Sequence, residues 1–130
     1  EVFSPFIKKL ETMKRFFFEL THEWMENNSV VAGFGAARSG PTLIAQYNLG
    51  KIIQYIFDDH PQKVYKYSPG DKIPIIPTVE LLKRRPNYTI ILAWIHGQKI
   101  IKKNKEYLEK GGKFVLCYPD ARIIDSVSDI

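Results

Sequence analysis

The sequence is poor in cysteine and has no long hydrophobic run, and each absence excludes a class of protein. Cys117 is the one cysteine, so no disulfide framework holds the chain, and its place in an apolar stretch predicts a buried, unreactive thiol. No stretch reaches the length of a membrane span, about 20 apolar residues, and Glu1-Val2-Phe3 lacks the basic start of a secretion signal. We therefore expect no membrane partner and a cytoplasmic location.

Neither sign of charge dominates the sequence. The 19 basic and 14 acidic residues leave a net charge of +5, which favours anionic partners without distinguishing phosphate esters, nucleic acid and lipid. The basic residues are dispersed, and the densest runs, Lys83-Arg84-Arg85 and Lys102-Lys103, fall in segments typical of exposed helix. The alternation of basic and aromatic residues that is typical of RNA-binding modules is missing, so we expect no nucleic-acid partner.

Apolar periodicity predicts a long first helix followed by alternating strands and helices. After Ser4-Pro5, apolar residues recur at spacings of three and four from Phe6 to Trp24, until Asn27-Asn28 ends the pattern. Runs rich in Val, Ile and Leu predict strands near residues 30–32, 52–57, 88–93 and 113–118, with a short edge strand at 75–76. Further helices are expected from Pro41 to about residue 48, from Thr78 to Arg85 and from Gly97 to Lys110.

Near-continuous apolar strands separated by helices are typical of a parallel sheet that helices cover on both faces. We therefore predict a Rossmann-like, three-layer α/β/α fold with a mostly parallel sheet of four to five strands. A chain of 130 residues suffices for one sizeable core. We expect a lead-in amphipathic helix over residues 1–28 and a Rossmann-like domain over residues 29–130, together forming one compact unit.

A glycine-rich segment, residues 33–40, lies between the first predicted strand and its helix. Backbone N–H groups and a helix N-terminus can hold a phosphate at this position of an α/β fold. Gly35 and Gly40 have the spacing of a Walker A loop, but they are followed by Pro41-Thr42, so the lysine that reaches the β/γ-phosphates is missing and NTP hydrolysis is not expected. A methyl-donor site of the S-adenosylmethionine type would also use a glycine turn, but no acidic residue opens the first strand.

The dinucleotide-binding fingerprint is matched in part. Gly33 and Gly35 are in place, and Asp58 or Asp59 follows roughly twenty residues later, but Arg38 stands at the position of the third glycine. The guanidinium of Arg38 can pair bidentately with a phosphate. The alternative is a tight turn in which this side chain contacts only water.

The three histidines are far apart in sequence and lack metal-ligand spacing, so we expect no metal site. His60 follows two aspartates at the end of one strand, and His96 follows Trp94 at the end of another. Ligands collect at these strand ends in open parallel sheets, and either ring could act as an acid or base near neutral pH. The alternative for each is a loop histidine without a proton-transfer role. Catalytic residues cannot be assigned from the sequence.

Five ordered blocks resemble the C-terminal domain of S-adenosylmethionine-dependent C-methyltransferases that act on nucleotide-linked deoxysugars. The blocks are Gly33–Gly40, Asp58–Lys63, Tyr67–Ile75, Leu92–Trp94 and Gly111–Phe114. The resemblance covers about residues 29 to 124. It departs from the family at Arg38, where a lysine is usual, and at Ile95 and Lys99, where asparagine and an acidic residue are usual.

The resemblance implies a Rossmann-like domain that does not itself bind the methyl donor. In that family a separate methyltransferase domain binds S-adenosylmethionine, and a nucleotide-linked sugar is expected in the cleft between the two domains. The resemblance thus implies the C-terminal part of a larger enzyme, or a freestanding relative, that needs a methyltransferase domain in cis or in trans. We expect no cofactor on this chain and no catalysis by it alone.

The carboxyl ends of the strands would then contribute the substrate contacts, with residues 67–73 closing over them. The candidate substrate-binding residues are Gly33, Gly35, Ala36, Arg38, Ser39, Asp58, His60, Trp94 and His96. Phe16 and Phe18 also widen the apolar face of the first helix, as a missing partner domain would require. Two other interpretations stay open: a dinucleotide- or coenzyme-binding module with Asp58 or Asp59 on a ribose, and an interaction domain that binds no ligand.

Overall fold

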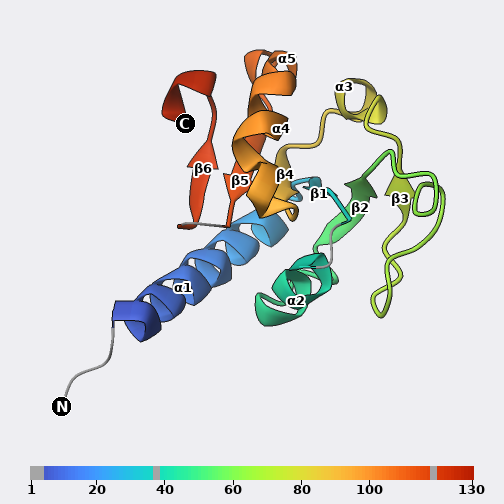
Figure 1. Cartoon of the computed structure of the whole chain (residues 1–130). Coiled ribbons are helices and arrows are strands. Elements are labelled where there is room, and N and C mark those ends of the chain that lie inside the picture. Colours follow the sequence, from blue (N-terminus) through green and yellow to red (C-terminus); the bar gives the residue numbers. More distant parts are fainter. Residues whose placement is uncertain (1–4, 37–38, 118–119) are drawn as a thin grey trace.

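Six strands form one sheet at the centre of the computed structural model, which describes residues 5–36, 39–117 and 120–130 (Figure 1). The strands are β1 (Val31–Phe34), β2 (Ile53–Phe57), β3 (Ile75–Ile76), β4 (Tyr88–Ile91), β5 (Lys113–Leu116) and β6 (Arg122–Ile124). They lie in the order β3-β2-β1-β4-β5-β6, and neighbouring strands are parallel except β5 and β6. The predicted α/β class and mostly parallel sheet are confirmed, whereas the antiparallel sixth strand exceeds the four to five expected.

Helices cover both faces of the sheet, and each face has its own apolar core. The helices α1 (Pro5–Glu26) and α2 (Ser39–Gln46) pack on one face, and α3 (Glu80–Arg84), α4 (Gly97–Lys103) and α5 (Lys105–Glu109) on the other (Figure 1). Successive strand residues point to opposite faces, so in β4 Ile90 joins the α1 side and Ile91 the α4 side. This double coverage explains the nearly continuous apolar runs of the central strands.

Helix α1 buries the apolar stripe that its periodicity predicted. The stripe enters the first core through Met13, Phe17, Leu20 and Trp24. Phe17 stacks on Tyr47 with ring centroids 4.5 Å apart. Phe16 is partly buried against the same core, but Phe18 is 65% exposed, so the sheet covers only part of the wide apolar face. Within the described ranges no helix is long and apolar enough to cross a membrane.

Two helix boundaries differ from the prediction. Helix α2 begins at Ser39 rather than Pro41. Proline is tolerated in this first turn because the N–H that it lacks would have no intrahelical partner. The single helix expected from Gly97 to Lys110 is interrupted at Asn104, whose backbone leaves the helical region at φ −118° and ψ 34°. The side-chain amide and the backbone N–H of Asn104 both donate to the Ile100 carbonyl, at 2.8 and 3.1 Å, and the Tyr107 N–H then bonds the Asn104 carbonyl at 3.1 Å in a tighter three-residue turn.

The strand order reverses between β1 and β4, whose carboxyl ends lie side by side. Strand β1 leads into α2 on one face, whereas β4 leads through the 3-10 turn η1 (Trp94–His96) into α4 on the other face. A second 3-10 turn, η2 (Val127–Asp129), follows β6. Open α/β sheets bind ligands in the crevice that such a reversal leaves. We call the two adjoining turns, residues 35–36 and 92–96, the crest.

Candidate functional site

The two turns of the crest touch each other at Gly35 and Ala93. The Phe34 carbonyl accepts the N–H groups of Leu92 at 3.0 Å and Ala93 at 3.3 Å. Gly35 has a φ of +89°, and a Cβ there would lie 2.5 Å from the Ala93 Cβ, so only glycine permits this contact. Gly33 lies one step further in, buried within β1, where a Cβ would lie 2.8 Å from Leu92 Cδ1. Of the two glycines, Gly35 is the one at the crest.

Residues that follow β2 form hydrogen bonds with both backbone polar groups of Ala36, its N–H and its carbonyl. Asp58 Oδ2 accepts the Ala36 N–H at 2.7 Å, and Oδ1 accepts the His60 N–H at 2.7 Å. Lys63 Nζ donates a hydrogen bond to the Ala36 carbonyl oxygen. The turn after β1 is therefore tied to the segment after β2. Sequence reasoning named Ala36, Asp58 and His60 but missed Lys63, although Lys63 ends the same sequence block as Asp58.

Asp59 and His60 make local hydrogen bonds of their own. Asp59 accepts the Thr78 N–H at 2.8 Å and the Thr78 hydroxyl at 2.5 Å. His60 Nδ1 accepts the Gln62 N–H at 3.2 Å, so the neutral ring of this exposed residue carries its proton on Nε2. Among the described residues, no group of three His, Cys, Asp or Glu side chains gathers closely enough to hold a metal ion.

A pocket of about 600 Å³ opens beside the crest on the side of α2, and we call it the α2 pocket. Its lining residues come from the crest, from α2, from β2 and β3, and from the loop before β3, and they are Ala36, Gly40, Pro41, Ile44, Ile56, Gln62, Lys63, Lys66, Tyr67, Ser68, Pro69, Ile75 and Leu92. The isoleucines and Leu92 are apolar, and two lysines supply positive charge, while none of the lining residues is acidic. An apolar cavity with a few polar groups is typical of small-molecule sites.

Residues 60–74 form one wall of the α2 pocket and are fixed to β3 by hydrogen bonds. The Tyr65 N–H donates to the Ile75 carbonyl at 2.7 Å, and the Ile75 N–H donates to the Lys66 carbonyl at 2.8 Å. Tyr65 adopts a φ of +65°, an unusual conformation for a bulky residue, and is 77% exposed. Tyr67, which lines the pocket, is 67% exposed. The wall therefore presents a largely uncovered aromatic ring next to Lys66.

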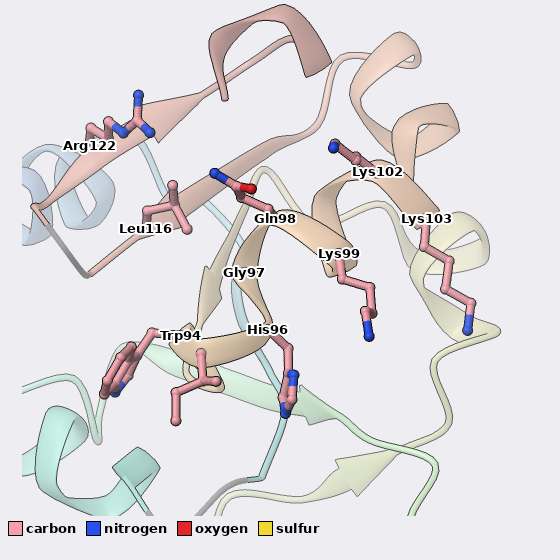
Figure 2. Close-up of a pocket in the computed structure, with 10 residues that line it drawn as sticks. Trp94, His96, Gly97, Gln98, Lys99, Lys102, Lys103, Leu116 and Arg122 are labelled. Carbon is pink, nitrogen blue, oxygen red and sulfur yellow. The ribbon is translucent and has the colours of Figure 1, made fainter.

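A second concavity of about 970 Å³ lies across the crest, over α4, and we call it the α4 groove. Figure 2 shows the residues that line it, which are Trp94, Ile95, His96, Gly97, Gln98, Lys99, Lys102, Lys103, Leu116 and Arg122. Two predicted site residues, Trp94 and His96, therefore line this groove, while Ala36 lines the α2 pocket. Gly35, Ala36, Trp94 and His96 thus lie in the crest, whereas Gly33 is buried in β1, and the described candidates do not share one cavity.

Two of the predicted site residues cannot be placed in full. Arg38 lies outside the described residues, so its pairing with a phosphate stays a prediction. Ser39 is the first residue of α2, at the side of the crest on which the α2 pocket opens.

Two buried titratable groups lie in the cores rather than in the pockets. Burial raises the pKa of the Cys117 thiol to about 12, and the side chain is 0% exposed, which confirms the buried thiol expected from the sequence. Burial likewise raises the pKa of Tyr107 to about 12. The Tyr107 hydroxyl donates to the Pro86 carbonyl at 2.7 Å and accepts from the Thr89 hydroxyl at 3.0 Å. This network is satisfied within the protein and serves the packing of α5.

The sequence matches the family described as C-methyltransferase C-terminal domain over residues 1–119. It is also 32% identical over 129 residues to the C-methyltransferase NovU of Streptomyces niveus. That alignment covers 98% of this chain but 31% of the relative, so the chain spans about a third of the relative's length. The five sequence blocks pointed to the same family, and the chain belongs to the C-methyltransferase C-terminal domain family.

Proposed function

We propose that this chain is the acceptor-binding domain of an S-adenosylmethionine-dependent C-methyltransferase and that it holds a nucleotide-linked sugar beside the crest. The observation that carries this proposal is the α2 pocket, which opens beside the crest and combines an apolar lining with Lys63 and Lys66 of the loop between β2 and β3. Lysine ammonium groups pair with phosphate oxygens, and apolar surface accepts the flat faces of a base or sugar.

The strand order supports a Rossmann-like assignment within this proposal. The order β3-β2-β1-β4-β5-β6 is that of doubly wound nucleotide-binding sheets, whose ligands bind where the order reverses. Here the reversal lies between β1 and β4, and the α2 pocket opens directly beside it. The antiparallel β6 departs from a fully parallel sheet but lies at the far edge from the pocket.

The methyl donor and the catalytic base are supplied, in this proposal, by a methyltransferase domain in cis or in trans. A donor or dinucleotide site in such a fold uses a carboxylate at the end of the second strand to bind ribose hydroxyls. Both oxygens of Asp58 already accept backbone N–H groups, and both oxygens of Asp59 accept from Thr78. These contacts give both carboxylates a structural role in their loops, and the chain alone is not expected to catalyse methyl transfer.

Isothermal titration of the 130-residue chain with a thymidine-diphosphate deoxysugar tests the proposal, with S-adenosylmethionine and NAD as parallel ligands at the same salt concentration. We expect the sugar nucleotide alone to bind. Lys66→Glu, on the pocket rim, should weaken its affinity about tenfold or more, because one charged hydrogen bond contributes about 1.5–3 kcal/mol. Lys51→Glu makes the same charge change on an exposed residue outside the α2 pocket and should leave the affinity unchanged.

Two outcomes would contradict the acceptor-binding proposal. Binding of NAD in preference to the sugar nucleotide would favour the dinucleotide-binding interpretation. Equal losses of affinity in Lys66→Glu and Lys51→Glu would show that the sugar nucleotide responds to net charge rather than to the α2 pocket.

A further inference from the structure

The acceptor-binding proposal gives no role to the charged residues that line the α4 groove. Its cationic side chains are Lys99, Lys102 and Lys103 from α4 and Arg122 from β6, and none of its lining residues is acidic. Arg122 already has partners, because its Nε lies 3.9 Å from Asp120 and its Nη1 donates to the Asp129 carbonyl at 2.9 Å. Leu116 of β5 is buried, with 3% of its surface exposed, whereas Ile95 in the turn before α4 is 74% exposed. A positively charged groove thus carries a large aliphatic side chain that nothing in the described chain covers.

The lysines of the groove are not neutralised by the described part of the chain. No carboxylate there lies within 4.0 Å of the ammonium groups of Lys99, Lys102 or Lys103. Asp59 shares a neighbouring pocket of about 440 Å³ with Lys99 and Lys103, but its two oxygens accept from Thr78. Like charges three and four residues apart on a helix repel each other. An anionic partner would relieve that repulsion.

The positive charges are spread along the groove rather than directed at one point. In Figure 2 the side chains of Lys99 and Lys103 extend to one side of α4, Lys102 lies on the other side, and Arg122 lies across the groove on β6. A single phosphate group cannot contact all four. Such a spread suits an extended partner with several carboxylates, and the exposed Ile95 offers an apolar contact beside the charges.

We propose that the α4 groove is a docking surface for an acidic protein segment that carries an apolar side chain. The carboxylates of the segment pair with Lys99, Lys102 and Lys103, and its apolar side chain packs on Ile95 at the mouth of the groove. This surface lies across the crest from the α2 pocket and shares no lining residue with it.

A fluorescent peptide of glutamates with one central leucine is the first probe, and its binding to the full chain is followed by anisotropy and by amide chemical shifts. We expect saturable binding with shifts concentrated at residues 95–103 and 122. The variant K99E/K102E/K103E should bind about tenfold more weakly or worse, because it turns three attractive contacts into repulsive ones. The matched control K8E/K14E/R15E makes the same change in net charge on exposed residues of α1 and should lose less than about twofold, the part due to net charge alone.

A second comparison isolates the apolar contact. Ile95→Ser should weaken binding of the leucine-containing peptide several-fold and leave binding of an all-glutamate peptide unchanged. Thermal unfolding of each variant confirms that it is folded, and Lys→Gln at the same three positions replaces the charge reversal if that variant is not. Equal losses in the α1 control, shifts outside the groove, or no saturable binding would overturn the proposal. Tighter binding of a single-stranded oligonucleotide at the same residues would overturn it too.

Discussion

Gly35→Ala is the substitution that tests the crest most directly. Two costs combine at this position. The φ of +89° is one that L side chains rarely adopt, which costs about 1–2 kcal/mol. The added Cβ would also lie 2.5 Å from the Ala93 Cβ, and relieving such overpacking costs about 1–3 kcal/mol. Alanine stiffens the unfolded chain and returns about 0.4–1 kcal/mol. We therefore expect the free energy of unfolding to fall by about 1–5 kcal/mol.

Gly70→Ala separates these two costs. Gly70 has a similar φ of +79°, but a Cβ there would have no atom within 4 Å. The substitution keeps the conformational cost and removes the steric one, so the loss should be about 1.5 kcal/mol or less and smaller than that of Gly35→Ala by the steric cost of about 1–3 kcal/mol. Urea unfolding of both variants, followed by far-ultraviolet circular dichroism, measures the difference.

The comparison has a clear refuting result. If Gly35→Ala and Gly70→Ala lose equal stability, the turns after β1 and β4 are not in contact at Gly35 and Ala93. The two turns of the crest would then be packed less closely than the structure shows, and the position of Ala36 and Leu92 in the lining of the α2 pocket would not be fixed by this contact.

Three further predictions concern the hydrogen bonds that Asp58 accepts, the stability of the fold at high pH and the role of Arg38. Asp58→Ala should leave two backbone N–H groups without their acceptor and cost about 1–3 kcal/mol, with faster hydrogen exchange at the Ala36 amide as the specific sign. The pKa values of Cys117 and Tyr107 are both raised to about 12 in the folded state, so the folded chain holds protons that the unfolded chain releases from about pH 9 upward. The free energy of unfolding should therefore fall between about pH 9 and 12, as measured by urea unfolding at a series of pH values. Tyr107→Phe should make that fall shallower. Arg38→Ala should weaken binding of the sugar nucleotide by about 1–3 kcal/mol in calorimetry, and unchanged affinity would remove Arg38 from the site.

The elements with strong local patterns were predictable from the sequence. Helix α1 and the central strands have periodic or continuous apolar runs, and these dictate burial directly. Strand β6 was missed because three residues, Arg122 to Ile124, are too few to show a period, and the strand exists through its pairing with β5. The break at Asn104 was missed because the helical spacing of buried apolar residues continues across it, from Ile101 to Leu108.

The candidate site was predictable as a list of positions but not as an arrangement. Sequence reasoning could place Ala36, Asp58 and Trp94 at strand ends, because parallel strands end at the same edge. It could not show that Lys63 reaches the Ala36 carbonyl, because that contact depends on how two loops pack against each other. Nor could it show on which side of the crest each residue lies.

The division of the crest into two sides follows from the topology and separates the two proposals. Because the order reverses between β1 and β4, the connection after β1 leads to α2 on one face, and the connection after β4 leads to α4 on the other. The α2 pocket has a largely apolar lining and two lysines, which suits a small ligand, whereas the α4 groove is wider and carries its charges apart, which suits an extended partner. Gly35 and Ala93 join the two turns at one contact. A ligand that moves the turn after β1 must therefore press on the turn that leads to the α4 groove, and amide shifts at residues 95–103 on addition of the sugar nucleotide would reveal that coupling.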